Sequence, residues 1–173
     1  MNQKVIEVVE KYGPSISPTY HQAVCTEMVI GVLEHLCDLT NDDKSNIRII
    51  IYEDVYELMD NGSPLPKGVY YALTKNEMGI PIDDQKQVLP GDFVQFWYPN
   101  SWGHCGILHS IDTSTNIMKL YSSFPSTDGY GIQEFDIPSY CYFVRLKEDV
   151  KKKDKIAEIQ EILKLVNFSF IGF

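Results

Sequence analysis

A cysteine and a histidine in this chain are placed as a cysteine hydrolase requires. Cys25 stands at the start of an apolar, helix-forming segment, residues 22–29, and His104 opens a strand-like segment, residues 103–107. In such an enzyme the thiolate is the nucleophile, and the imidazole both generates it and later protonates the leaving group. The pair therefore predicts acyl-transfer chemistry, provided that the fold brings the two segments together.

Cys25 also has an ordinary interpretation as a core residue. Free cysteine is among the most buried residue types, and the apolar stripe that contains Cys25 continues through Met28. A reactive thiol would need the positive end of the helix dipole, but the spacing of Thr19 and Gln22 suits a capping box that would start the helix earlier. Glu27 adds a negative charge close by, which opposes thiolate formation.

His104 has ordinary alternatives as well, because a histidine at a strand end often caps the backbone by a hydrogen bond. The residues of a conceivable zinc site are Cys25, His104, Cys105 and His109. Adjacent strand residues point to opposite faces of a sheet, so His104 and Cys105 are poorly placed to hold one ion. His109 falls on the face opposite His104 for the same reason. We therefore expect no metal site and no cofactor.

The order of these segments resembles the NlpC/P60 and CHAP peptidoglycan hydrolases, which are papain-like cysteine peptidases and amidases. The matching residues are Cys25, the segment Gly91-Asp92-Phe93-Val94-Gln95-Phe96 and the segment Gly103-His104-Cys105-Gly106-Ile107. The resemblance covers about residues 20–125. It departs from the family at the nucleophile, where NlpC/P60 proteins usually carry Asp-Cys-Ser-Gly and this chain has Val24-Cys25-Thr26-Glu27.

The resemblance implies a catalytic triad built on Cys25 and His104. The third residue of the family, usually His, Asn or Gln, comes from the strand after the histidine strand. That segment offers only hydroxyls here, so Ser122 is the expected orienting residue, with Tyr121 and Ser123 as alternatives. A hydroxyl accepts a hydrogen bond from the imidazole but lacks the charge of a carboxylate, so it stabilises the imidazolium less.

The resemblance also assigns substrate-binding residues. The backbone N–H of Cys25 and a side chain from the preceding loop, Tyr20 or Gln22, would hold the oxyanion. Trp102 would form a wall of the substrate groove.

The function implied by the resemblance is hydrolysis of an amide bond in bacterial cell-wall peptides, with peptidoglycan or a muropeptide as substrate. The N-acetylmuramoyl–alanine bond and a bond within the stem peptide both remain open. Two alternatives stand beside it: a non-catalytic binding module that kept the fold, and an acyltransferase that uses the same dyad. For an enzyme delivered into another cell's periplasm, delivery machinery and an inhibitor or immunity protein would be further partners.

Composition excludes several other classes of function. The formal net charge of −9 argues against nucleic acid or an anionic membrane as the partner. No run of ~20 apolar residues exists, so no membrane span is expected, and the amino end lacks the apolar core of a signal peptide. We therefore expect a chain made in the cytoplasm, unless a signal peptide has been trimmed from it.

The 173 residues are expected to form one domain, 1–173, of the α+β class with a papain-like NlpC/P60 fold. Apolar periodicity predicts helices over about 2–12, 25–36, 45–60 and 69–78, with a strand over 49–51 as the competing interpretation of the third. Strands are expected over 93–98, 105–111, 117–122 and 140–146, joined by turns. A C-terminal helix is expected near 151–166.

Overall fold

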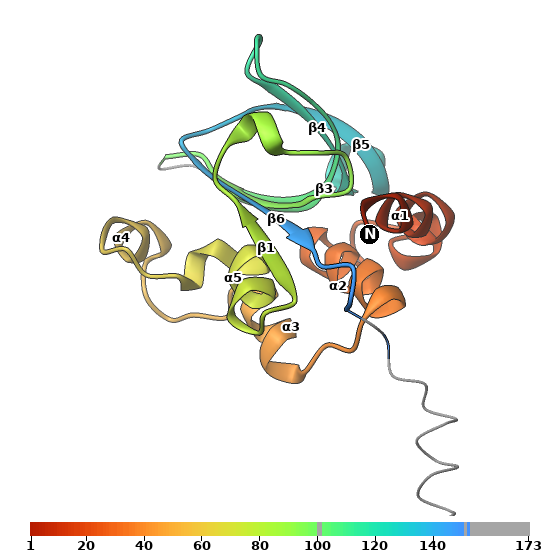
Figure 1. Ribbon diagram of the computed structural model, residues 1–173, viewed down its shortest axis with the longest axis horizontal. Coiled ribbons are helices and arrows are strands. Elements are labelled where there is room, and N and C mark those ends of the chain that lie inside the picture. The colour runs from red at the N-terminus through yellow and green to blue at the C-terminus, as the bar shows by residue number, and fades with distance from the viewer. Residues whose placement is uncertain (100–101, 151, 153–173) are drawn as a thin grey trace, which may run out of the picture.

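The computed structural model describes residues 1–99, 102–150 and 152, in which helices come first and a sheet follows (Figure 1). The helices are α1 (Asn2–Ile16), α2 (Cys25–Leu36), α3 (Asn41–Arg48), α4 (Val55–Asp60) and α5 (Gly68–Lys75). The strands are β1 (Gly79–Ile82), β2 (Phe93–Trp97), β3 (Gly103–Asp112), β4 (Ile117–Phe124), β5 (Gly129–Asp136) and β6 (Tyr140–Leu146). The expected α+β class, with N-terminal helices packed on an antiparallel sheet, is confirmed.

The strands form a six-stranded antiparallel sheet in the order β1-β6-β2-β3-β4-β5. Strands β2 to β5 follow one another as neighbours, and β6 returns to pair with β2 and β1. The sheet curves strongly, and α1, α2 and α5 lie beside it (Figure 1). In the central pair of strands, Gln95 lies opposite Cys105 and Phe96 lies opposite His104.

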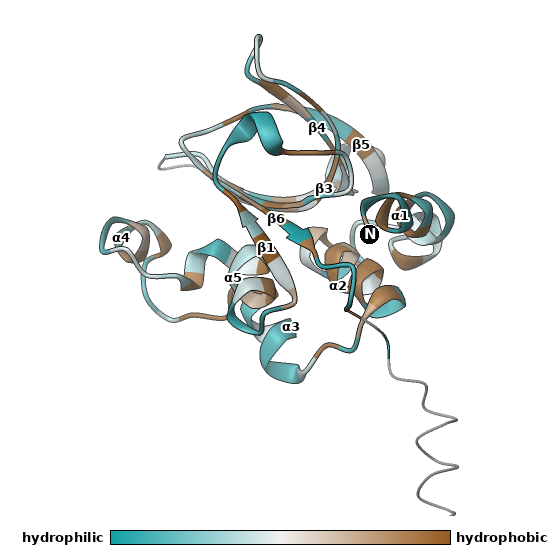
Figure 2. Ribbon diagram, in the orientation of Figure 1, coloured by the Kyte–Doolittle hydropathy of each residue, from teal (hydrophilic) through white to brown (hydrophobic). Residues whose placement is uncertain are grey.

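Both faces of the sheet carry an apolar core. Phe93, Cys105 and Ile107 pack with α1, α2 and α5 on the helical side, whereas Val94 and Phe96 belong to a second cluster with Leu108, Met118 and Phe143. Strand β2 is therefore apolar at consecutive positions, since it is buried on both faces. Apolar residues are also concentrated on α2, while α3 is largely hydrophilic (Figure 2).

The helix expected over 45–60 is wrong in its bounds, because two helices occupy this region. Thr40 and Asp43 form a reciprocal capping box, which starts α3 at Asn41. Ile49 ends α3 with a positive φ of 53°, and the side chain of Asp54 then caps α4. The competing strand over 49–51 is wrong as well, because these residues belong to neither kind of element.

Helix α1 extends past the expected stop at Gly13-Pro14 and ends at Ile16. Pro14 lies in the last turn of α1 and is exposed. The helix ends with a hydrogen bond from the Ser17 N–H to the Gly13 carbonyl (2.9 Å). A proline in that position removes one hydrogen bond without blocking the rest of the helix.

Two edge strands were not expected from the sequence. Strand β1 is only four residues long and contains Pro81, which fits an edge position because a proline cannot donate to a ladder. Strand β5 follows a short turn after β4 and pairs along the whole of β4. Edge strands are short or polar on one face, so their periodicity is weak in the sequence.

The helix expected near 151–166 lies outside the described residues, and the assignment of 1–173 to one domain stays a prediction. In the part of the chain that the structure describes, no helix has both the length and the apolar character needed to cross a membrane.

Candidate active site

Cys25 is the first residue of the twelve-residue helix α2. The Thr19–Gln22 pair does not start this helix, because Thr19 Oγ1 bonds to Gln22 within a turn that precedes it. Val24 is the N-cap and offers no side-chain cap, so the N–H groups of the first turn stay open. The thiol of Cys25 thus lies at the positive end of the helix dipole, which favours the thiolate.

The negative charge of Glu27 is compensated. Arg48, the last residue of α3, makes a bidentate ion pair with this carboxylate, with Nε–Oε1 at 2.6 Å and Nη2–Oε2 at 2.9 Å. The pair lowers the pKa of Glu27 and keeps it ionised. Because its charge is paired, Glu27 opposes the thiolate of Cys25 much less than an isolated carboxylate would.

The surroundings of Cys25 lower the pKa of its thiol. The largest cause is a hydrogen bond with the thiol of Cys105, and the hydrogen bond and positive charge of His104 act in the same direction. Burial opposes both. The pKa of Cys105 is raised by its interaction with Cys25 and by burial, so Cys105 remains the protonated donor and Cys25 holds the negative charge.

Iodoacetamide is expected to modify Cys25 at pH 6 well before the other three cysteines. Burial raises the pKa of Cys37 to about 12 and raises that of Cys141, and Cys105 is buried and protonated, so none of these three is a thiolate at pH 6. Peptide mass mapping after a short exposure measures the order of labelling. Because the pKa of Cys25 is lowered, its rate should change little from pH 6 to pH 8; a rise of about tenfold per pH unit would contradict a perturbed thiol.

His104 is 7% exposed and is held by aromatic rings. Its imidazole stacks on Phe124 at a centroid distance of 5.0 Å, and the ring centroids of Phe135 and Trp102 lie 5.8 Å and 5.7 Å away. Its Nε2 is buried and has no hydrogen-bond partner among the described residues. Stacking therefore fixes the plane of the ring.

Ser122 is not hydrogen-bonded to His104 in the described structure. Its buried hydroxyl donates to the carbonyl of Cys105 at 2.8 Å, and Tyr121 and Ser123 bond to Glu10 and Ser17. The orienting role assigned to Ser122 has no hydrogen bond to support it, because β4 presents the ring of Phe124 to the imidazole instead. Ser122 acts on the backbone of the histidine strand rather than on the histidine.

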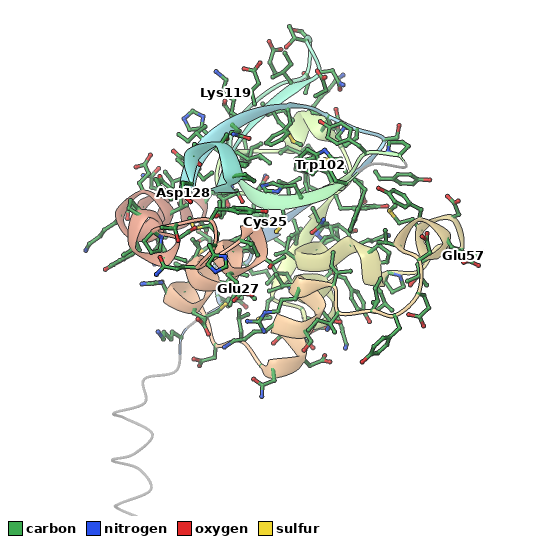
Figure 3. The ribbon with its side chains drawn as sticks, turned by 180° about the vertical axis from the view of Figure 1, so that it is seen from behind. Cys25, Glu27, Glu57, Trp102, Lys119 and Asp128 are labelled. Atoms are coloured by element: carbon green, nitrogen blue, oxygen red, sulfur yellow. The ribbon has the colours of Figure 1, made fainter. Side chains whose placement is uncertain are left out.

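Two cavities meet at Cys25 and His104, and both residues line each cavity together with Gly103. The first, here the polar cavity, measures about 410 Å³ and is lined also by Arg48, Asp54 and Gln95. The second, here the aromatic cavity, measures about 500 Å³ and is lined also by Tyr20, Trp102, Phe124 and Phe135. Figure 3 shows Cys25 where α2 meets the sheet. A bond placed at the thiol would thus have room on both sides.

The structure places two of the three expected substrate-binding residues beside Cys25 and the third away from it. Tyr20 and Trp102 both line the aromatic cavity beside Cys25, and Trp102 is 45% exposed. Gln22 is exposed, bonds to Thr19 and lines neither cavity. Of the two side chains considered for the oxyanion, Tyr20 is therefore the one placed near the thiol.

Sequence reasoning missed Gln95, which lies in the wall of the polar cavity opposite Cys105. It is 2% exposed; its Nε2 makes a long bond of 3.4 Å to the Phe96 carbonyl, and its Oε1 has no partner among the described residues. A polar residue within an otherwise apolar strand was the available signal. A buried amide without a full set of partners is unusual and points to a role in the site.

The glycine and aspartate of the two motif segments have structural roles. Gly106 packs against β4 so closely that a Cβ there would lie 2.7 Å from the Tyr121 carbonyl. Gly91 has a φ of +90° and lies against Asn2, and Asp92 accepts hydrogen bonds from Asn2 and Arg145. Gly106 thus allows close packing of β3, the strand that carries His104, on β4, and Asp92 links the start of β2 to α1 and β6.

Among the described residues, no group of three or more His, Cys, Asp or Glu side chains is arranged to bind a metal ion. Cys105 and His104 lie on opposite faces of β3, as the alternation of strand residues requires.

Comparison of the chain with protein-family models, with curated proteins and with solved structures finds no match.

Proposed function

We propose that this protein is a cysteine hydrolase with a papain-like fold of the NlpC/P60 or CHAP type, which cleaves an amide bond in bacterial cell-wall peptides. The observation that carries the proposal is the thiol of Cys25 at the start of α2, with a lowered pKa and in interaction with His104. The order along the chain, a helix that begins with the cysteine followed by a strand that carries the histidine, supports the papain-like fold. The segments 91–96 and 103–107, which resemble those of the peptidoglycan hydrolases, support cell-wall peptides as the substrate class.

The reaction follows from the positions of these groups. The thiolate of Cys25 attacks the amide carbonyl, and the N–H groups at the start of α2 stabilise the oxyanion. His104 gives its proton to the departing amine as the C–N bond breaks, which leaves a thioester on Cys25. Water, deprotonated by His104, then attacks the thioester and releases the acid. The amide of Gln95 and the ring of Tyr20 line the cavities on the two sides of this thiol.

The geometry supports a dyad rather than a hydrogen-bonded triad. Phe124 and Phe135 fix the imidazole by stacking, where related enzymes would use a polar side chain. An acyltransferase would differ in one step only, since another nucleophile would replace water. A non-catalytic binding module would not need a cysteine with a lowered pKa, so the electrostatics of Cys25 favour catalysis.

Digestion of purified peptidoglycan and soluble muropeptides, followed by mass spectrometry, tests the proposal. We expect new fragments from the wild type and none from the Cys25→Ala variant, with masses that identify the bond. No fragments from a wild type whose Cys25 alkylates rapidly would contradict the substrate class. No fragments together with an unreactive Cys25 would favour the binding module.

A further inference from the structure

The aromatic cavity has a chemical character of its own. Its described lining includes the rings of Tyr20, Trp102, Phe124 and Phe135, together with Pro125, and it contains no leucine, isoleucine, valine or methionine. Apart from the thiol of Cys25 and the imidazole of His104, every described residue that lines it is uncharged. The cavity is therefore shaped by flat faces of rings and suits a flat, neutral group better than a flexible aliphatic chain.

Two neutral polar side chains accompany these rings. Ser126, in the turn after β4, is exposed, and Gln133, on β5, is half-buried; both line the same cavity and hydrogen-bond to each other. A hydroxyl and a carboxamide donate and accept hydrogen bonds without carrying charge. Aromatic faces with neutral hydrogen-bonding groups at the rim match a pyranose ring, which has an apolar C–H face and hydroxyls around its edge.

The polar cavity on the other side of Cys25 differs in charge. Arg48, Glu53 and Asp54 contribute to its lining, and both signs of charge are present. Amino and carboxyl groups of a peptide would find complementary partners there, whereas they would have none in the aromatic cavity. The two sides of the thiol are thus suited to different halves of one substrate.

We propose that the aromatic cavity is a saccharide-binding site, and that the amide cleaved at Cys25 is the one adjacent to the sugar rather than one within the stem peptide. This inference rests on the proposed function and names the part of the substrate that each side of the thiol receives. Trp102 and Tyr20 contact the sugar ring, and Gln133 bonds to its hydroxyls. The peptide extends into the polar cavity.

Ligand-observed NMR with N,N′-diacetylchitobiose, a neutral disaccharide without an amide-linked peptide, tests the binding site directly. Chitobiose is expected to bind the wild type. Trp102→Ala should weaken that binding by roughly 3- to 10-fold, because it removes one stacking face. Gln133→Glu, which keeps the size of the side chain, should weaken it too, while Gln85→Glu adds the same charge at an exposed site away from the cavity and should leave it unchanged.

Several results would overturn the inference. One is no detectable chitobiose binding to a wild type that is folded by its thermal transition; another is binding that neither Trp102→Ala nor Gln133→Glu alters. The digestion of peptidoglycan tests the inference independently. If its products still join sugar to peptide, the saccharide site is overturned, but the proposed hydrolase activity stands. Chitobiose binding without any cleavage would reject the hydrolase and leave the saccharide site in place.

Discussion

Cys25→Ala is expected to lower the rate of amide hydrolysis by at least ~10⁴-fold, since no other group can form the thioester. The free energy of unfolding should change by less than about 1 kcal/mol, because the side chain is partly exposed at the first position of a helix, where alanine is well tolerated. Rates are measured on the muropeptide that the wild type cleaves, and stability by thermal unfolding.

Cys141→Ala is the matched control for this substitution. Cys141 is also partly buried, but it lies on β6 beside the second apolar cluster and lines neither cavity at the active site. Its substitution should leave the rate unchanged. A Cys25→Ala protein that keeps its activity, or one that unfolds easily, would support the interpretation of Cys25 as a core residue.

Asp92→Ala is expected to lower the free energy of unfolding by about 3 kcal/mol, the largest effect on stability that we anticipate. The carboxylate is fully buried and accepts bonds from the Arg145 guanidinium (2.8 Å to each oxygen), from Asn2 Nδ2 (2.8 Å) and from the Leu89 N–H (2.8 Å). Without this carboxylate, the partly buried Arg145 loses its ion-pair partner. Asn2, at the start of α1, loses a hydrogen bond. Denaturant unfolding measures the difference in free energy.

Asp83→Ala removes the same charge from an exposed position nine residues earlier and should change stability by less than about 0.5 kcal/mol. If Asp92→Ala lowered the free energy of unfolding no more than this control, the hydrogen bonds of Asp92 would not be what stabilises the start of β2. Because Asp92 lines neither of the two cavities beside Cys25, the folded variant should still alkylate at Cys25 at pH 6.

The strongly periodic elements of the fold could be read from the sequence. Helix α2 and strands β2, β3, β4 and β6 fall close to their expected bounds, since each presents a sustained apolar pattern to a core. The division between α3 and α4 could not be read in this way, because it depends on the left-handed backbone at Ile49 and on side-chain caps at Thr40 and Asp54.

The sequence pointed to some residues of the candidate site and not to others. Cys25 and His104 carry reactive groups at recognisable element starts, so residue type and local pattern were enough to select them. Ser122 was selected because the resembling family takes its third residue from the strand after the histidine strand, but the pairing of β3 with β4 directs this hydroxyl to a backbone carbonyl. Gln95 was missed because nothing in a single strand shows which buried polar group lacks a partner.

The sequence by itself determined the α+β class, a helix in the region of Cys25 and a strand beside His104, because these depend on local periodicity and on residue chemistry. The tertiary structure decided what surrounds them: the thiol of Cys105 beside Cys25, the aromatic rings that hold His104, the Arg48 that neutralises Glu27, and the two unlike cavities. Each of these brings together residues far apart in the chain. Such contacts depend on sheet register and helix packing, which no local pattern specifies.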